Sequence, residues 1–304
     1  MEKKLFEMLT GKLLGDGNLT IQKGRKSRLR FSHSIYDKDW CFYCYTKLRK
    51  YLPINEPKYI KIKDPRVSKG YTEQYYVQSK TDPILCYLKD LWYENKTKVI
   101  PKEFIKLYLS PLALGWWYLD DGHLKLDNNG TPIKIILSTD SFTKEENFFL
   151  IQLLREKFEL RLKLDKQNRL ILYDKPQIFY FLKLIKPHLQ YKMERKFIQQ
   201  TSYKKVNTDK RTTIYLPENL NISKPTEQIN LILKQNVYLI KNKLNNLISY
   251  KKIIIKYHNF QTIPKESLKP YTFVIWKDEL NELLKLKTIS GFTFSFLTYL
   301  CIDK

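Results

Sequence analysis

Apolar and polar residues in the first 200 positions follow a repeating order of helical and strand periodicities. Helical spacing runs from Leu5 to about Asp16, and a hairpin, a helix, a second hairpin and a closing helix follow it. The same α-ββ-α-ββ-α order starts again at Ser110 and ends near residue 189. The leading acids of the two halves, Asp16 and Asp121, are 105 positions apart. This repetition predicts two halves, 1–98 and 99–200, in a two-fold-like arrangement.

The predicted strands separate an apolar face from a basic face. In the first hairpin Leu29, Phe31 and His33 alternate with Arg28 and Arg30. In the second hairpin the alternation predicts that Ile60 and Ile62 point inward and that Lys61 and Lys63 point outward. The last hairpin has the clearest alternation, in which the leucines at 160, 162, 164, 170 and 172 are interleaved with Arg161, Lys163 and Arg169. We therefore expect two sheets, each with a basic outer surface.

The order of elements ends at about residue 200. The stretches 229–258 and 272–287 favour helices, and the segment contains no cluster of catalytic residue types. We expect residues 201–304 to form a basic, mostly helical extension, whose role the sequence does not indicate.

Net charge narrows the class of partner. The chain has 55 lysines and arginines against 31 acidic residues, a net charge of +24 that is spread over its whole length. A folded protein this basic most often meets a polyanion, and nucleic acid is the most common one. No apolar run reaches the roughly 18 residues of a membrane span, and the N-terminal residues lack the pattern of a secretory signal.

The use of cysteine and alanine bears on where the protein works. The four cysteines make no disulfide framework or zinc set, so we expect buried or partly buried thiols and a reducing, intracellular compartment. A single alanine, few glycines and abundant Lys, Ile, Asn and Tyr indicate an AT-rich gene. Such genes occur in mitochondria and plastids and in low-GC bacteria and their phages.

Two predicted helices end directly in acids, in "LTGKLLGDG" (9–17) and "LGWWYLDDG" (114–122). An anion at a helix C-terminus is disfavoured by about 0.3–1 kcal/mol. Gly11 and Gly15 share one face of the first helix, and the second helix has little bulk at Ala113 and Gly115, so the helices can pack closely and bring Asp16 and Asp121 together. Two facing carboxylates require a cation, and with no His or Cys at ligand spacing the donors favour Mg²⁺.

A metal between carboxylates can activate water for attack at phosphorus. The basic sheet faces supply candidates for DNA contacts, because β-ribbons can enter the major groove and arginine or lysine reads guanine there. Those candidates are Arg25, Arg28, Arg30, Lys61, Lys63, Lys134, Arg161, Lys163 and Arg169. Each of these basic residues has an alternative interpretation as part of an ordinary solvated sheet face. The segment Asp16-Gly17-Asn18, taken alone, is also typical of a simple turn.

The two acid-ended motifs resemble those of a single-chain, two-motif LAGLIDADG homing endonuclease. The flanking segments "KTKVIPKEFIKLYLSPLA", "LSTDSFTKEE" and "LIKPHLQYKMERKF" are also similar, and the resemblance covers about residues 5–200. It implies two pseudo-symmetric αββαββα domains with saddle-shaped antiparallel sheets, an α+β fold. It also implies a monomer that hydrolyses both strands of a long DNA target across the minor groove and leaves 3′ overhangs.

The resemblance also implies roles for particular residues. Asp16 and Asp121 would bind Mg²⁺, with Mn²⁺ as an expected substitute, and the preceding residues Gly15 and Asp120 adjoin the metal site. Asp120 is a rival to Asp121, although the motif register favours Asp121. By register, the basic residues that position water or steady charge at the scissile phosphate fall on Lys98 and Lys196. The histidines at 33, 123 and 188 lack partners at ligand spacing, and we expect them to be structural.

Two other functions stay open at this stage. A group I intron maturase has the same fold and would use the basic extension on RNA, alone or beside nuclease activity. A DNA-binding regulator on this scaffold would not need Asp16 or Asp121. The sequence does not predict the target DNA.

Overall fold

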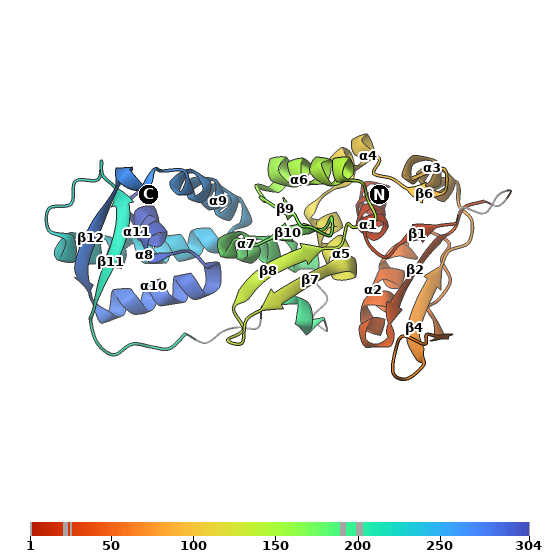
Figure 1. Cartoon of the computed structure of the whole chain (residues 1–304), viewed down its shortest axis with the longest axis horizontal. Helices are drawn as coiled ribbons and strands as arrows, with labels where there is room; N and C mark the ends of the chain where they lie inside the picture. Colours follow the sequence, from red (N-terminus) through yellow and green to blue (C-terminus); the bar gives the residue numbers. More distant parts are fainter. Residues whose placement is uncertain (1, 21–23, 25, 189–192, 199–202, 304) are drawn as a thin grey trace.

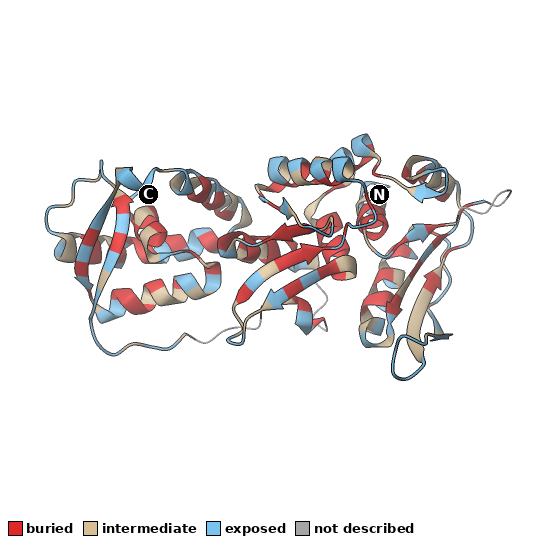
Figure 2. Cartoon of the chain, in the orientation of Figure 1, coloured by how far each residue is buried: buried red, intermediate tan, exposed pale blue. Residues whose placement is uncertain are grey.

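The computed structural model describes residues 2–20, 24, 26–188, 193–198 and 203–303. Three parts follow one another along the longest axis of the molecule, with the first half at one end, the second half in the centre and the extension at the other end (Figure 1). The predicted α+β class, with two similar halves and a mostly helical extension, is confirmed. Buried side chains run through the interior of all three parts (Figure 2).

The first half is a four-stranded antiparallel sheet with helices on one side. Its elements are α1 (Glu2–Leu14), β1 (Asn18–Leu19), β2 (Leu29–Ser34), η1 (Ile35–Asp37), α2 (Lys38–Leu48), β3 (Lys58–Lys63), β4 (Tyr71–Gln78), α3 (Pro83–Trp92), and the short pair β5 (Tyr93–Glu94) and β6 (Thr97–Lys98). The strand order is β1-β2-β4-β3, so β3 is an edge strand. Asp82 caps α3 by accepting a hydrogen bond from the amide of Ile84 at 2.9 Å.

The second half repeats this order. Its elements are α4 (Lys102–Tyr108), α5 (Pro111–Asp121), β7 (Gly122–Leu126), β8 (Pro132–Leu137), α6 (Lys144–Phe158), β9 (Lys163–Leu164), β10 (Leu170–Leu172), α7 (Lys175–Ile185), η2 (Lys186–His188) and η3 (Glu194–Lys196). The sheet order is β7-β8-β10-β9, which matches the first sheet strand for strand. Thr143 and Glu146 form a capping box at the start of α6.

The extension contains β11 (Lys210–Pro217), α8 (Pro225–Asn245), α9 (Leu247–Gln261), η4 (Lys265–Ser267), β12 (Leu268–Ile275), α10 (Lys277–Ser290) and α11 (Phe294–Ile302). The expectation of a helix over 272–287 was partly wrong, because Thr272–Ile275 belong to a strand and the helix begins at Lys277. β12 pairs antiparallel with β11, which lies more than fifty residues earlier. No local turn signal marks such a pairing in the sequence.

The extension is packed tightly against the second half. The rings of Tyr180 in α7 and Tyr250 in α9 meet edge to face at 5.2 Å, and the hydroxyl of Tyr257 donates to Asp174 at 2.9 Å. Gly291, which ends α10, has a φ of +72°, and a Cβ there would lie 3.0 Å from a ring carbon of Phe179. Both its backbone conformation and this close approach require glycine. The junction therefore has a defined geometry.

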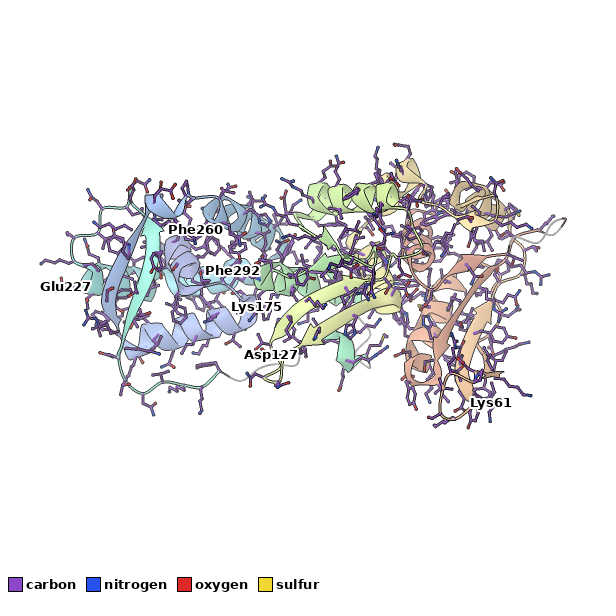
Figure 3. The ribbon with its side chains drawn as sticks, in the orientation of Figure 1. Lys61, Asp127, Lys175, Glu227, Phe260 and Phe292 are labelled. Atoms are coloured by element: carbon purple, nitrogen blue, oxygen red, sulfur yellow. The ribbon has the colours of Figure 1, made fainter. Side chains whose placement is uncertain are left out.

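Register corrects one prediction about the sheet faces. Side chains of directly paired strand residues lie on the same face, and Tyr75 pairs with both His33 and Tyr59. Lys61 (labelled in Figure 3) and Lys63 follow Tyr59 at spacings of two and four, so they share its face. That is the face that α2 covers, where Phe42 meets Tyr75, rather than the outer face.

Burial agrees with this register. The predicted inward position of Ile62 was wrong, since its side chain is 39% exposed. The edge strand β3 is mostly exposed on both faces, and its alternation therefore did not indicate which side faces the core. In β2, by contrast, Leu29 and Phe31 are fully buried as expected.

Two further sequence expectations concern membranes and thiols. Among the residues that the structure describes, none of the helices is both long enough and apolar enough to cross a lipid bilayer. All four cysteines are free thiols, of which Cys41, Cys44 and Cys301 are buried and Cys86 is half-buried. This agrees with the expected absence of a disulfide framework.

Helices α1 and α5 lie in direct contact at the centre of the two halves. A Cβ on Gly11 would lie 2.5 Å from the carbonyl oxygen of Ala113 and 2.6 Å from Cβ of Trp116. A Cβ on Gly15 would lie 2.5 Å from Cβ of Asp120. The glycine strip on α1 is therefore what lets the helices approach. Gly115 does not take part, because it faces Ile185 and His188 instead.

We predict that Gly11→Ala destabilises the protein by about 3 kcal/mol, since a methyl group there meets backbone that cannot move independently. Gly115→Ala is the matched control. It has the same gain in helix propensity, but its nearest neighbour is the Cβ of His188 at 3.1 Å. Urea unfolding of both variants measures the difference. Equal free energies of unfolding for the two would contradict the role of the glycine strip.

Candidate active site

The two motif helices end side by side and place two acids at the junction of the halves. The backbone amide of Asp16, just after α1, donates to Oδ2 of Asp120 at 3.2 Å. Asp121, the last residue of α5, follows directly. The side chain of Asp16 keeps 34% of its surface exposed, and Asp121 is half-buried. A ligand from solvent can thus reach both carboxylates.

The electrostatics of Asp121 reflect this crowding of acids. Burial raises the pKa of its carboxyl to about 7, and the negative charges of Asp16 and Asp120 add to the rise. Lys196 and Lys98 oppose it. The carboxylate form of Asp121 is thus disfavoured until a positive charge comes close.

Each motif helix also has a lysine at its C-terminal end. Nζ of Lys98 donates to the carbonyl oxygens of Leu13 at 2.9 Å and Gly17 at 2.8 Å. Nζ of Lys196 donates to the carbonyl oxygens of Tyr118 and Asp120, each at 3.1 Å. An ammonium at a helix C-terminus offsets the negative end of the helix dipole. Both lysines are strongly desolvated, and burial lowers the pKa of Lys98 and takes that of Lys196 to about 8.

Asp120 has a full set of protein partners. Its Oδ1 accepts from Nζ of Lys12 at 2.8 Å and from Nε1 of Trp40 at 2.7 Å, while Oδ2 accepts from the amide of Asp16. The side chains of Lys12 and Asp120 are both completely buried. Burial favours the neutral form of Lys12, but the nearby negative charges, that of Asp120 first, together with the hydrogen bond to Asp120 outweigh burial and raise the pKa of that ammonium above its usual value. Asp120 therefore forms a buried ion pair between the halves.

His33 links this ion pair to Asp16. Its Nε2 lies 2.9 Å from Nζ of Lys12, and its Nδ1 lies 3.1 Å from Oδ2 of Asp16. An ammonium only donates, so Nε2 accepts, Nδ1 carries the hydrogen, and the imidazole donates to Asp16. Burial raises the pKa of Asp16, but the hydrogen bond from His33 and nearby positive charge outweigh burial and lower it.

Sequence reasoning missed His33 and Lys12 as parts of the site. Strand alternation did place His33 on the buried face of β2, and helical spacing places Lys12 among the buried residues of α1. A titratable side chain at a buried position next to a motif was the available signal. The ammonium of Lys12 also lies over the ring of Phe31, 4.4 Å from its centroid.

The carboxylates at this junction are of the donor type that a hard divalent cation prefers. Ligand atoms of Asp16, His33 and Asp120 all lie within 4.8 Å of one another. Of these, Asp120 and His33 are engaged in the buried network, whereas Asp16 presents a partly exposed oxygen pair. Asp121 adds a second carboxylate whose charged form a cation would favour. Gly15 contributes space for Asp120.

The outer faces of the two sheets present basic side chains. Arg28 and Arg30 are exposed on the first sheet, and Arg161 and Lys163 on the second. Lys134 stacks over the ring of Tyr173 at 5.9 Å on that same second face. Lys125, which pairs with Lys134, is exposed there too, and sequence reasoning missed it although its alternation in β7 indicated it.

The remaining candidates for DNA contact differ in their surroundings. Arg169 is held by its own hairpin, with Nη2 2.7 Å from Oδ2 of Asp165. Lys61 and Lys63 lie on the opposite face of the first sheet, as described above. Arg25 lies outside the described residues.

The model of the LAGLIDADG DNA endonuclease family matches residues 6–178, which is more than half of the chain. The chain belongs to the LAGLIDADG DNA endonuclease family. The match includes both motif helices and both sheets, and it ends within α7, before the extension.

Named relatives include both endonucleases and maturases. DNA endonuclease I-ChuI of Chlamydomonas applanata is 31% identical over 145 residues, which are 45% of this chain and 65% of that protein, slightly under two thirds of its length. Cytochrome b mRNA maturase bI2 of Debaryomyces hansenii is 29% identical over 208 residues, 64% of this chain and 74% of the relative. Among solved structures, the homing endonuclease I-WcaI bound to its DNA recognition sequence has a TM-score of 0.55 at 23% identity, over 65% of this chain and 87% of that one. This likeness shows a shared fold.

We predict that Asp120→Asn destabilises this LAGLIDADG protein by about 3–5 kcal/mol, because it leaves the buried ammonium of Lys12 without its counter-charge. The substitution keeps the size of the side chain, so lost packing does not contribute. Asp64→Asn is the control, since it breaks an ion pair with Arg66, whose side chain is 87% exposed, and we expect a far smaller loss. Chemical denaturation of both variants measures this, and similar losses would contradict the importance of burial.

Proposed function

We propose that this chain is a divalent-metal-dependent DNA endonuclease that hydrolyses both strands of a specific site. The observation that carries the proposal is that close packing of α1 against α5 brings the acids Asp16 and Asp121 together. This pair lies between two sheets whose outer faces are basic. The relatives named as endonucleases support it, as does family membership.

In this proposal Asp16 and Asp121 hold the metal, Mg²⁺ with Mn²⁺ as a substitute. The bound cation would supply a Lewis acid that activates water and stabilises charge at phosphorus. Asp120 and Gly15, also predicted at the metal site, act through structure: Asp120 anchors Lys12, and Gly15 leaves room for Asp120. Lys98 and Lys196 fix the ends of the two motif helices and place positive charge beside the acids, where it lowers the cost of bringing a phosphate close.

The remaining chain determines how DNA is presented. Arginines and lysines on the outer sheet faces contact the duplex, and each half serves one strand. A single chain supplies both halves, so the active form is a monomer. Cleavage across the minor groove with 3′ overhangs is part of the proposal. So is an origin in an organelle or in a low-GC bacterial or phage host, which relatives named as intron-encoded support.

The direct test uses selection followed by cleavage. Duplexes that bind the purified protein are selected from a randomised library, and the selected site is cloned into a plasmid. We expect Mg²⁺ to convert the supercoiled plasmid to a linear form with ends at the selected site. A plasmid that is bound but stays intact at every Mg²⁺ and Mn²⁺ concentration would refute nuclease activity and leave a DNA-binding regulator.

We predict that Asp16→Asn and Asp121→Asn each reduce cleavage by at least about a hundredfold and leave DNA affinity within about threefold. An amide keeps the shape of the side chain but lacks the charge that holds a cation. Asp140→Asn, an exposed acid outside the site, is the control and should cleave normally. Activity is measured in single turnover and affinity by gel shift in Ca²⁺. A variant that loses binding as strongly as cleavage would argue against a purely metal-binding role.

We predict that His33→Ala slows one strand more than the other. His33 donates to Asp16 only, and the described residues offer the carboxylate of Asp121 no such hydrogen bond. Loss of an outer partner of a metal ligand typically costs about 10–100-fold in activity or metal affinity. Nicked plasmid should therefore accumulate, while calorimetry should show weaker Ca²⁺ binding. His123→Ala, at an exposed position, serves as control, and equal slowing of both strands would contradict an asymmetric role.

A second candidate function is RNA splicing. Two relatives are named as cytochrome b mRNA maturases, from Debaryomyces hansenii and Saccharomyces cerevisiae, and the extension provides a basic surface outside the nuclease frame. Splicing of the intron RNA that carries or adjoins the gene, with and without protein, tests it. Faster splicing by the Asp16→Asn variant would show an RNA function that does not depend on cleavage.

A further inference from the structure

A basic cavity of about 600 Å³ lies at the junction between the second half and the extension. The turn between β7 and β8 forms one wall, the start of α7 a second, and β11 with α10 the others. Asp127 and Lys175, labelled in Figure 3, lie on the second-half side of this junction. No activity proposed above uses the cavity.

Four lysines line the cavity, namely Lys175, Lys204, Lys210 and Lys287, and all four are exposed. Its lining contains no acidic residue among those that the structure describes. Apolar side chains form the floor, and Nζ of Lys287 lies over the ring of Phe294, 5.3 Å from its centroid. The charge of Lys175 is partly balanced by Asp127, whose pKa it helps to lower. The other three lysines bring further positive charge together, and like charges repel, so the arrangement favours an anionic ligand.

The position of the cavity beside the second sheet indicates which kind of anion it would bind. Thr131 in its wall belongs to the β7–β8 hairpin, whose outer face carries Lys125 and Lys134. The second sheet and the extension are neighbours along the longest axis of the molecule (Figure 1). A duplex that lies along the outer sheet faces and continues past the second sheet toward the extension would come to the cavity lysines next.

The extension is suited to a fixed contact of this kind. Its residues 201–304 include 17 lysines and arginines against 8 acids. The α10 end that carries Lys287 is held against α7 by Gly291, whose Cα has no room for a side chain. The lysines are thus presented by a packed junction, and little order has to be gained on binding.

We propose that these lysines bind the phosphate backbone of duplex DNA just beyond the half-site that the second sheet contacts. The inference rests on the proposed DNA-binding function and adds a third, one-sided contact region to the two sheets. Phosphate contacts of this type raise affinity and make it dependent on salt, without adding sequence specificity.

The test compares duplexes of different length on the full chain. The selected site is trimmed to the shortest duplex that keeps binding, and ten base pairs of arbitrary sequence are added to either end. We expect extension of one end to tighten binding about tenfold near 0.15 M salt, with a log–log salt slope steeper by about 3. Extension of the other end should change little. Ethylation interference should locate the added phosphate contacts on that one side.

The test variant is a triple substitution, Lys204→Gln with Lys210→Gln and Lys287→Gln. It should lose the gain in affinity that the longer end gives, and it should still bind and cleave the short duplex like wild type. The control, Lys234→Gln, Lys241→Gln, Lys243→Gln, removes the same charge from exposed positions of α8 away from the cavity and should keep the gain. Equal gains in both triple variants, or no gain at either end in the wild type, would overturn the inference. So would binding of intron RNA through these lysines without any effect of flanking DNA. Failure to bind the short duplex at all would instead refute the proposed function.

Discussion

Close packing of α1 against α5 is the constraint on which the site depends. Gly11 and Gly15 remove the side chains that would separate the helices, and the contact places Asp16 and Asp121 at the same junction. This juxtaposition is unfavourable in itself, because both acids sit at negative helix ends and repel each other. Lys98 and Lys196, bonded to the terminal carbonyls of the two helices, partly offset that cost. Packing holds this geometry. It leaves an excess of negative charge at the two acids, which a bound cation can neutralise.

The two halves are alike in order but not in chemistry. Gly15 and Asp120 occupy matching positions in the two motifs, and the missing side chain at one makes room for the carboxylate at the other. Asp120 then binds Lys12 of the first half, and Lys12 orients His33 toward Asp16. A symmetric pair of acids at these positions would not fit. The buried ion pair thus joins the halves and at the same time makes the surroundings of Asp16 and Asp121 unequal.

Sequence reasoning found what depends on local pattern and order. These are the repeat of elements, both acid-ended helices and the basic alternation of β2 and β9, which follow from periodicity and turn chemistry. It failed where a property depends on long-range contact. The face of Lys61 is set by pairing with β4, and the pairing of β11 with β12 joins distant segments. His33 gained its role from Lys12 and Asp16, which no spacing in the sequence links to it.

The unequal surroundings of the two acids and the unequal parts of the whole molecule have a common consequence. A pseudo-symmetric frame alone would bind a DNA site in either direction, because the two sheets have the same strand order. Here the outer faces differ: arginines dominate the described part of the first, and lysines with Arg161 dominate the second. The extension lies beyond the second half only. On the proposed function, each difference would contribute a free-energy gap between the two orientations, and gaps from separate regions would add. The acid held by His33 would then always face the same strand, and the unequal halves would impose a fixed order of events on an asymmetric site.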